Sequence, residues 1–223
     1  DFSHYVDDPY VEKGFDRDAL TEELEVLVIG GGFGGMLAAA RLIEQGITDI
    51  KIIEKGGGFG GTWYWNRYPG AACDIESYVY LPMLEETGFV PRQKYTDAPE
   101  TLAYCQVLAE KFGLNDLALM QTEVVSTEWD ETTRRWTVTT NRQDNLKARY
   151  VVHSNGPLNR PKLPAIKGIG DYKGHTFHTS RWDYDYTGGN SHGGLDKLAD
   201  KRIAIIGTGA TAVQCVPHLG AGA

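Results

Sequence analysis

Short apolar runs alternate along the chain with longer segments whose apolar residues recur at helical spacing. Residues 25–29 (EVLVI) and 50–53 (IKII) predict two buried strands. Between them, apolar residues every three to four positions predict a helix over residues 36–44. Strand, helix and strand in this order favour a βαβ unit with parallel strands.

The remaining pattern predicts a second helix over residues 101–112, on which the apolar residues share one face. Residues 123–129 and 135–140 alternate as strands do, around a polar turn, which predicts a β-hairpin. Residues 150–153 predict another buried strand. Residues 201–206 (KRIAII) predict a last one, leading into a helix.

A glycine fingerprint, residues 30–35 (GGGFGG), joins the first strand to the first helix. Glycines at such a turn let backbone N–H groups approach a pyrophosphate. The second strand ends in Glu54, where this fold carries a carboxylate that accepts hydrogen bonds from ribose hydroxyls. A carboxylate there would repel a 2′-phosphate, so the site favours FAD or NAD over NADP. The alternative is a glycine-rich loop of an ordinary α/β protein. The candidate contacts are Gly30, Gly32, Phe33, Gly35 and Glu54.

A second fingerprint, residues 207–212 (GTGATA), follows the strand predicted over residues 201–206. Two dinucleotide sites in one chain are typical of flavoproteins in which a nicotinamide reduces a flavin. Only 16 residues follow Gly207, whereas a βαβ unit needs about 30. We therefore expect the second unit to be incomplete and the chain to be the N-terminal part of a longer protein. The candidate contacts are Gly207, Thr208, Gly209, Thr211 and Gln214, although a threonine at a helix start can also be a simple cap.

These patterns predict an α/β fold with two Rossmann-like dinucleotide-binding domains of the two-dinucleotide flavoprotein type, the second one truncated. We expect an N-terminal extension over residues 1–22. Residues 23–156 would form the N-terminal part of an FAD-binding domain, with the β-hairpin as an insertion. Residues 157–223 would begin an incomplete NADP-binding domain, after a proline-rich linker at 157–164.

Composition and charge exclude several other classes of protein. The net charge of −8 and the absence of a basic run argue against a nucleic-acid partner. No apolar stretch approaches the length of a membrane span, and no secretory leader is visible. The three cysteines, Cys73, Cys105 and Cys215, form no metal or disulfide motif, which favours a reducing cytoplasm. The six histidines show no metal-ligand spacing, so no metal is expected.

Two further motifs resemble one enzyme family. The loop at residues 60–74 (GGTWYWNRYPGAACD) looks like the flavin-adjacent loop of class I Baeyer–Villiger monooxygenases. Residues 172–183 (YKGHTFHTSRWD) are similar to the signature F-x-G-x-x-x-H-x-x-x-W-[P/D] of that family. They match it at Gly174, His178, Trp182 and Asp183 and depart from it at Tyr172, which stands for Phe. The resemblance extends from about residue 22 to residue 220.

The resemblance implies a reaction in which NADPH reduces FAD and O2 then forms a C4a-peroxyflavin. This species attacks a ketone, and the adduct rearranges to an ester or lactone. It also implies that the carboxylate of Asp74 is catalytic, because it orients an arginine that lies beyond Ala223, so that the remainder of the polypeptide is required. The residues that the resemblance places around FAD are Thr62, Trp63, Tyr64, Trp65, Asp74, Tyr80 and the backbone of Val124.

Other functions and roles stay open at this point. A related N- or S-oxygenating flavin monooxygenase would lack the Trp182-Asp183 ending. A truncated, non-catalytic nucleotide-binding fragment is the third possibility. Asp74 could instead cap a helix, the aromatic residues of the loop could be core residues, and His178 and Trp182 could act mainly in packing and domain coupling.

Overall fold

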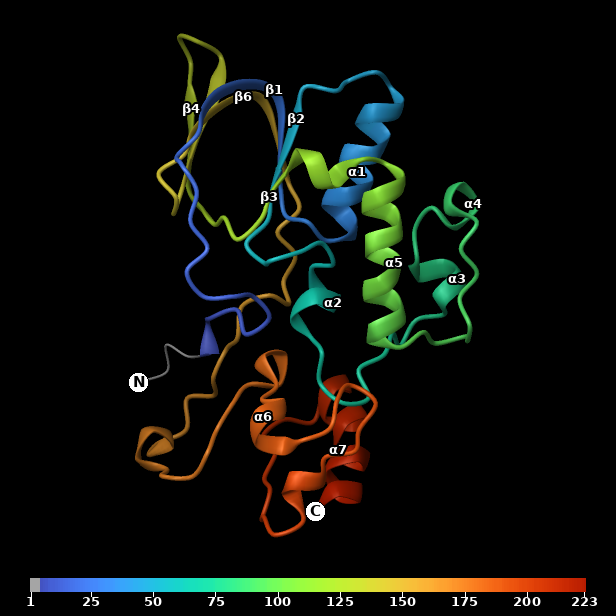
Figure 1. The fold of residues 1–223 in the computed structure, drawn as a ribbon. Coiled ribbons are helices and arrows are strands. Elements are labelled where there is room, and N and C mark those ends of the chain that lie inside the picture. Colours follow the sequence, from blue (N-terminus) through green and yellow to red (C-terminus); the bar gives the residue numbers. More distant parts are fainter. Residues whose placement is uncertain (1–4) are drawn as a thin grey trace.

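The computed structural model describes residues 5–223, so residues 1–4 of the expected extension lie outside the described part. One six-stranded mixed sheet organises the chain up to residue 153 (Figure 1), in the order β3-β2-β1-β6-β5-β4. Four neighbouring strands are parallel, and the last two form an antiparallel hairpin. The strands are β1 (Thr21–Ile29), β2 (Ile50–Ile53), β3 (Ala118–Leu119), β4 (Val124–Asp130), β5 (Arg135–Thr140) and β6 (Asn145–His153).

The connections place a change of direction between β1 and β6. From β1 the chain crosses through α1 (Phe33–Glu44) to β2 on one side, whereas β6 pairs with the other side of β1. The two strands run in register from Thr21 opposite Asn145 to Ile29 opposite His153. In open α/β sheets, ligands bind at the carboxyl ends of the strands at such a switch point.

Helices α1 and α5 (Ala98–Lys111) cover one face of the sheet (Figure 1). Helix α5 begins at Asp97, whose side chain accepts a hydrogen bond from the backbone N–H of Glu100 at 2.9 Å. Residues such as Val28, Ile52 and Leu108 form the core under these helices. The shorter helices of this part are α2 (Thr62–Trp65), α3 (Ser77–Tyr80), α4 (Leu84–Thr87) and η2 (Leu114–Leu117). Among residues 5–223, no helix has both the length and the apolar character needed to cross a bilayer.

The structure confirms the strand predicted at residues 50–53 and the β-hairpin. Strands β1 and β6, however, start four and five residues earlier than predicted, at Thr21 and Asn145. Their first halves alternate polar and apolar side chains or are mostly polar, and they pair with each other. In β6 the fully buried residues, Leu146 and Ala148, lie before the predicted run, whereas Tyr150 within it is 51% exposed. The apolar runs therefore marked only part of each strand, and backbone pairing sets the full length. The hairpin extends the sheet, because β5 pairs with β6.

The predicted strand at residues 201–206 is wrong. These residues pair with no strand in the described part of the chain, and Ile203 and Ile206 are 39% and 67% exposed. A strand needs a neighbouring backbone to satisfy its N–H and C=O groups, and none lies beside this one. The elements found after residue 156 are η3 (Ile169–Asp171), η4 (Thr179–Arg181), α6 (Tyr184–Thr187), η5 (Asp196–Leu198) and α7 (Ala210–Gly222). The expected second sheet is thus not formed among residues 5–223.

Helix α7 packs against the loop at residues 60–74 rather than against a sheet. Cys215 and Leu219 of the helix join a cluster with Trp63, Tyr68 and Trp182. The cluster attaches α7 to the loop, and α7 lies below α2 in the view of Figure 1. The domain boundary predicted near residue 156 stays a prediction.

Candidate functional site: a cavity at the carboxyl ends of the parallel strands

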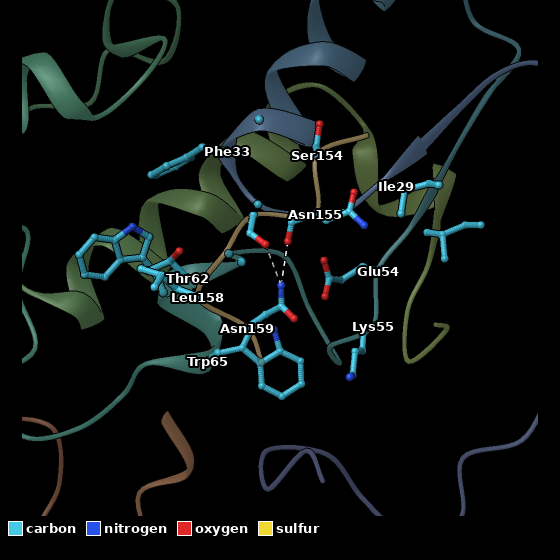
Figure 2. Close-up of a pocket in the computed structure, with 18 of the residues that line it drawn as sticks. Ile29, Phe33, Glu54, Lys55, Thr62, Trp65, Ser154, Asn155, Leu158 and Asn159 are labelled. Carbon is cyan, nitrogen blue, oxygen red and sulfur yellow. Dashed lines mark hydrogen bonds between the residues drawn. The ribbon is translucent and has the colours of Figure 1, made fainter. Parts of the chain in front are cut away.

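A cavity of about 390 Å³ opens where β1, β2 and β6 end (Figure 2). This is the switch point of the sheet, where a dinucleotide is expected. Of the residues predicted for the first nucleotide, Gly30, Gly32, Phe33, Glu54, Thr62, Trp63, Trp65, Tyr80 and Val124 line the cavity. Gly35, Tyr64 and Asp74 do not line it.

The glycines of the first fingerprint are required for different reasons. Gly30 has φ of +110°, and a Cβ there would lie 2.4 Å from the carbonyl oxygen of Ser154. A Cβ at Gly35 would lie 1.8 Å from the oxygen of Gly30, so this glycine allows the helix to approach the strand. At Gly32 the nearest atom would be the Cα of Gly61 at 3.4 Å, an ordinary contact. Gly32 therefore keeps the cavity, rather than the fold, free of a side chain.

The start of α1 offers unpaired backbone N–H groups to this cavity. Its N-cap is Gly32, which provides no side-chain cap, and the first turn contains no acidic residue. The N–H groups of the first turn and the helix dipole therefore favour an anion such as a pyrophosphate.

Glu54 is the buried carboxylate of the cavity, at 5% exposure. It accepts hydrogen bonds from the backbone N–H groups of Gly31 at 2.5 Å and Gly56 at 2.6 Å. Burial raises the pKa of Glu54, while the two N–H donors lower it. The side chain is fixed with its carboxylate toward the cavity (Figure 2), where remaining lone pairs can accept from ribose hydroxyls.

Helix α2 and Tyr80 form an aromatic wall. The indole N–H of Trp63 donates to the Tyr80 hydroxyl at 3.0 Å, and the rings of Phe33 and Tyr80 meet edge-on at 5.8 Å. Tyr64 lies on the other side of α2, where its hydroxyl donates to Asp8 at 2.7 Å. Because a helix directs neighbouring side chains to different faces, α2 presents Trp63 and Trp65 to the cavity and Tyr64 to the N-terminal segment.

Two further walls were missed by sequence reasoning. Ser154, Asn155 and Asn159 follow β6, and the Asn159 amide donates to the carbonyl oxygen of Asn155 at 2.8 Å (Figure 2). Thr122 and Glu123 precede β4. No motif marks these residues. Their positions next to the ends of predicted strands were the available signal.

Asp74 is exposed and lies in the bend before α3. It does not cap this helix, because the N-cap is Glu76. Burial raises the pKa of Tyr80, and the charge of Asp74 adds to this shift. Asp74 is thus close enough to act electrostatically on the aromatic wall, although it does not reach the cavity.

The second fingerprint forms the same turn as the first. Gly209 has φ −80° and ψ −175°, against −80° and −176° at Gly32, and both residues are N-caps. No atom would contact a Cβ at Gly207 or Gly209 within 4 Å. Gln214 faces the loop instead, accepting from the Tyr68 hydroxyl at 2.7 Å and donating to a carbonyl oxygen at 2.9 Å. Gly207, Thr208, Gly209, Thr211 and Gln214 all lie outside the cavity lining.

The signature residues make hydrogen bonds and helix caps within their own part of the chain, and they do not line the cavity. Trp182 is 4% exposed, and its indole N–H donates to the Thr187 hydroxyl at 3.1 Å. His178 caps η4, and burial lowers its pKa. Asp183 caps α6 by accepting from the N–H of Tyr186 at 3.0 Å. A Cβ at Gly174 would lie 2.2 Å from the hydroxyl oxygen of Tyr172.

Comparison with known proteins shows which family this chain resembles. The family model described as pyridine nucleotide-disulphide oxidoreductase matches residues 27–219. The chain belongs to this family. It is 53% identical over 218 residues to Baeyer–Villiger monooxygenase ATR8 of Stachybotrys chlorohalonatus, covering 98% of this chain and 35% of that protein. The resemblance to Baeyer–Villiger monooxygenases that the two motifs indicated is therefore confirmed.

Solved structures of this group superpose closely. The polycyclic ketone monooxygenase from the thermophilic fungus Thermothelomyces thermophila has a TM-score of 0.92 and 41% identity, covering 99% of this chain and 37% of that one. OTEMO in complex with FAD and NADP has a TM-score of 0.80 and 34% identity, covering 90% of this chain and 37% of that one. The chain thus spans little more than a third of the length of these proteins.

Proposed function

We propose that this chain forms the FAD site and the beginning of the NADPH site of a flavin-dependent Baeyer–Villiger monooxygenase. The observation that carries the proposal is the cavity at the switch point, which combines a glycine turn, a buried carboxylate and an aromatic wall. The likeness to a polycyclic ketone monooxygenase and to a structure containing FAD and NADP supports it.

The residues present fit FAD. Gly30, Gly32 and the start of α1 would bind the pyrophosphate, because a Cβ at Gly32 would occupy the approach and the first turn is uncapped. Glu54 would accept hydrogen bonds from the ribose. The flavin side of the molecule would lie near Thr62, Trp63, Trp65, Tyr80 and Val124.

When bound and reduced by NADPH, FAD supplies the chemistry that activates O2 and inserts one oxygen atom next to a ketone carbonyl, giving an ester or lactone. The chain's own contribution is binding, orientation and exclusion of water. Trp63 and Trp65 are 7% and 1% exposed, so packing holds both indoles in place, and their apolar surface would help to exclude water from the flavin. Asp74 would orient a cation for the developing negative charge, from its position beside the aromatic wall.

The second fingerprint would bind the NADPH pyrophosphate. Its turn repeats the backbone of the first, and the space around Gly207 and Gly209 is open. We also propose that the activity needs polypeptide outside residues 1–223, because residues 201–206 have no strand partner among residues 5–223. The cytoplasmic location expected from the cysteines stays a prediction.

The test uses the complete polypeptide that carries this chain. Purified protein should show flavin absorbance, and NADPH oxidation should rise when a cyclic ketone is added, with ester or lactone detected by gas chromatography. A protein that binds no flavin would contradict the assigned cofactor. A protein that oxygenates only sulfides or amines would favour the N- or S-oxygenating alternative. The Trp182-Asp183 ending argues against that alternative, because the related N- and S-oxygenating enzymes would lack it.

A further inference from the structure

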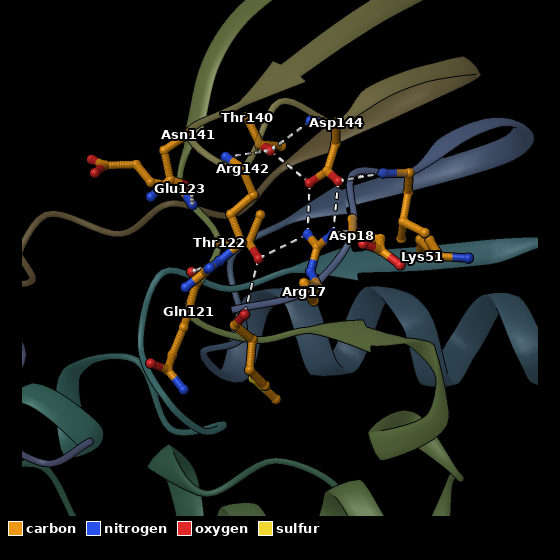
Figure 3. A network of polar contacts seen from close by, with 12 residues as sticks. Arg17, Asp18, Lys51, Gln121, Thr122, Glu123, Thr140, Asn141, Arg142 and Asp144 are labelled. Carbon is orange, nitrogen blue, oxygen red and sulfur yellow. Dashed lines mark hydrogen bonds and ion pairs between the residues drawn. The ribbon is translucent and has the colours of Figure 1, made fainter. Parts of the chain in front are cut away.

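The N-terminal segment before β1 is tied to the sheet by a buried ion pair (Figure 3). Arg17 binds Asp144 with both nitrogen tips of its guanidinium, at 2.7 and 2.6 Å. The side chains are 18% and 0% exposed. The Asp144 carboxylate also accepts from the Thr140 hydroxyl at 2.6 Å and from the backbone N–H of Leu20 at 2.8 Å. These hydrogen bonds satisfy the Asp144 carboxylate, whereas the Nε of Arg17 is buried without a hydrogen-bond partner. The two parallel bonds between guanidinium and carboxylate hold the pair in one geometry.

The ion pair reaches the cavity through Thr122. Arg17 donates to the Thr122 hydroxyl at 3.2 Å, and that hydroxyl donates in turn to the carbonyl oxygen of Met120 at 2.9 Å. The backbone N–H of Thr122 donates to the carbonyl oxygen of Glu54 at 2.9 Å. Thr122 is 0% exposed, and residues 122–124 line the cavity next to Glu54. Hydrogen bonds therefore connect Arg17, through Thr122, to the cavity wall and to the segment that carries Glu54.

The residue just before this wall, Gln121, has an unusual backbone conformation. Gln121 has φ of +50°, in the left-handed region that residues other than glycine rarely adopt. Its carbonyl oxygen accepts from Arg142 at 2.7 Å, and its N–H donates to the carbonyl oxygen of Gly56 at 2.9 Å. Arg142 also donates to the carbonyl oxygen of Phe15 at 3.1 Å. Two arginines thus connect the N-terminal segment to both sides of the bend at residues 121–122.

We propose that Arg17 and Asp144 are positioning residues for the nucleotide site, holding the wall at residues 122–124 in the shape that binds FAD. The inference rests on the proposed function of the cavity. Neither residue lines the cavity, so both act through Thr122. A buried ion pair contributes little net stability compared with apolar residues of similar size, so stability alone does not account for this one. The side chain outside the ion pair to which Arg17 donates a hydrogen bond is that of Thr122.

The test measures FAD affinity of the complete polypeptide, by fluorescence titration of the apoprotein. We expect Arg17→Met, Asp144→Asn and Thr122→Val each to raise the Kd for FAD about tenfold, since each removes a hydrogen bond of a charged network. Arg17→Lys, which keeps the charge and one donor, should recover part of the loss. Arg149→Met is the matched control. It removes the exposed Arg149–Glu25 pair on β6 and β1, far from the cavity lining, and should leave Kd within twofold.

A double-mutant cycle separates positioning from mere stability. If Arg17 acts through Thr122, Arg17→Met should add less than twofold to the Kd of the Thr122→Val protein. A purely structural pair would lower the unfolding temperature of the apoprotein and leave Kd unchanged, which would overturn the inference. Should Asp144→Asn fail to fold, Thr122→Val decides the same question, because valine has the same shape. A parent protein that binds no FAD would refute the proposed function instead, so the two failures are distinguishable.

Discussion

Glu54 and Asp144 are buried carboxyl groups whose pKa values are shifted in opposite directions. Glu54 has only backbone N–H donors as partners, and burial raises its pKa. At Asp144 burial also opposes ionisation, but the hydrogen bonds from Arg17, Thr140 and Leu20 outweigh it and lower the pKa to about 2. The first arrangement leaves acceptor capacity for a ligand, whereas the second uses that capacity within the fold.

The low pKa of Asp144 predicts a pH dependence of stability. The unfolded carboxyl has a pKa of about 3.9, so the unfolded state takes up the proton first as the pH falls. The stabilisation from Asp144 should be complete above about pH 5 and should be lost between about pH 4 and 2. Urea unfolding of the parent and of Asp144→Asn over this range checks it. A difference between the two proteins that stays constant down to pH 2 would contradict the assignment.

The glycines of the first fingerprint predict a contrast between two alanine variants. Gly32→Ala should fold normally, because its Cβ would meet only an ordinary contact, yet it should lose FAD because the methyl enters the pyrophosphate approach. Gly35→Ala should lose about 3 kcal/mol of stability or more, because its Cβ would overlap the oxygen of Gly30. Flavin absorbance and thermal unfolding distinguish the two. Full FAD content in Gly32→Ala would refute this pyrophosphate site.

Asp74 carries a prediction about catalysis without a loss of folding. Asp74 is exposed and fills no cavity, so Asp74→Ala should retain its fold and FAD. Ketone oxygenation in the complete polypeptide should fall at least about tenfold, because the cation it orients loses its partner. Ester formation measured by gas chromatography is the readout, with Asp74→Asn as the variant of equal size. Unchanged product formation would remove Asp74 from the catalytic residues.

At the scale of elements, Arg181 joins three segments that are distant in sequence. Its guanidinium is 6% exposed and lies 4.0 Å from the Trp65 ring centre. It donates to the carbonyl oxygens of Asp7 at 2.8 Å and Asn159 at 3.2 Å. The short helix η4 thus connects α2, the N-terminal segment and the chain after β6. Arg181 lies in the signature, just before Trp182. Through Arg181 the signature contacts Trp65 and Asn159, which line the cavity, although the signature residues themselves do not.

We expect Arg181→Lys to destabilise the protein by about 1 to 3 kcal/mol, because an ammonium cannot stack on Trp65 and reach both carbonyl oxygens together. Urea unfolding monitored by tryptophan fluorescence measures this. Arg92→Lys, at an exposed position, is the control and should be neutral. Equal stability of the Arg181→Lys protein and the parent would show that the three segments are held by other contacts.

At the scale of the whole molecule, the C-terminal part is attached through packing rather than through a sheet. Cys215 and Leu219 of α7 pack against Trp63 and Tyr68 of the loop, and Gln214 bonds to that loop. The second fingerprint therefore keeps its turn, although residues 201–206 before it form no strand in the described part of the chain. Of the second nucleotide site, residues 5–223 therefore form the glycine turn and the start of α7, without a sheet beside them.

We expect residues 1–223 alone to be unable to reduce bound flavin rapidly with NADPH. The turn at Gly207 and Gly209 is open, and in the described part of the chain no strand lies beside residues 201–206 to complete the site. Stopped-flow mixing of the flavin-loaded fragment with NADPH is the measurement, with the complete polypeptide as the positive control. Rapid bleaching of the flavin in the fragment would show that the second site is complete without further chain.

Local pattern alone determined β2, the hairpin, the first helix with its glycine turn and the carboxylate at Glu54. In these segments the spacing of apolar residues and the chemistry of a tight turn act over a few neighbouring positions. Tertiary structure decided which residues surround the cavity, because Thr122, Ser154 and Asn159 meet there only once the sheet is assembled. It also decided against the strand at residues 201–206, since a strand exists only where another backbone pairs with it.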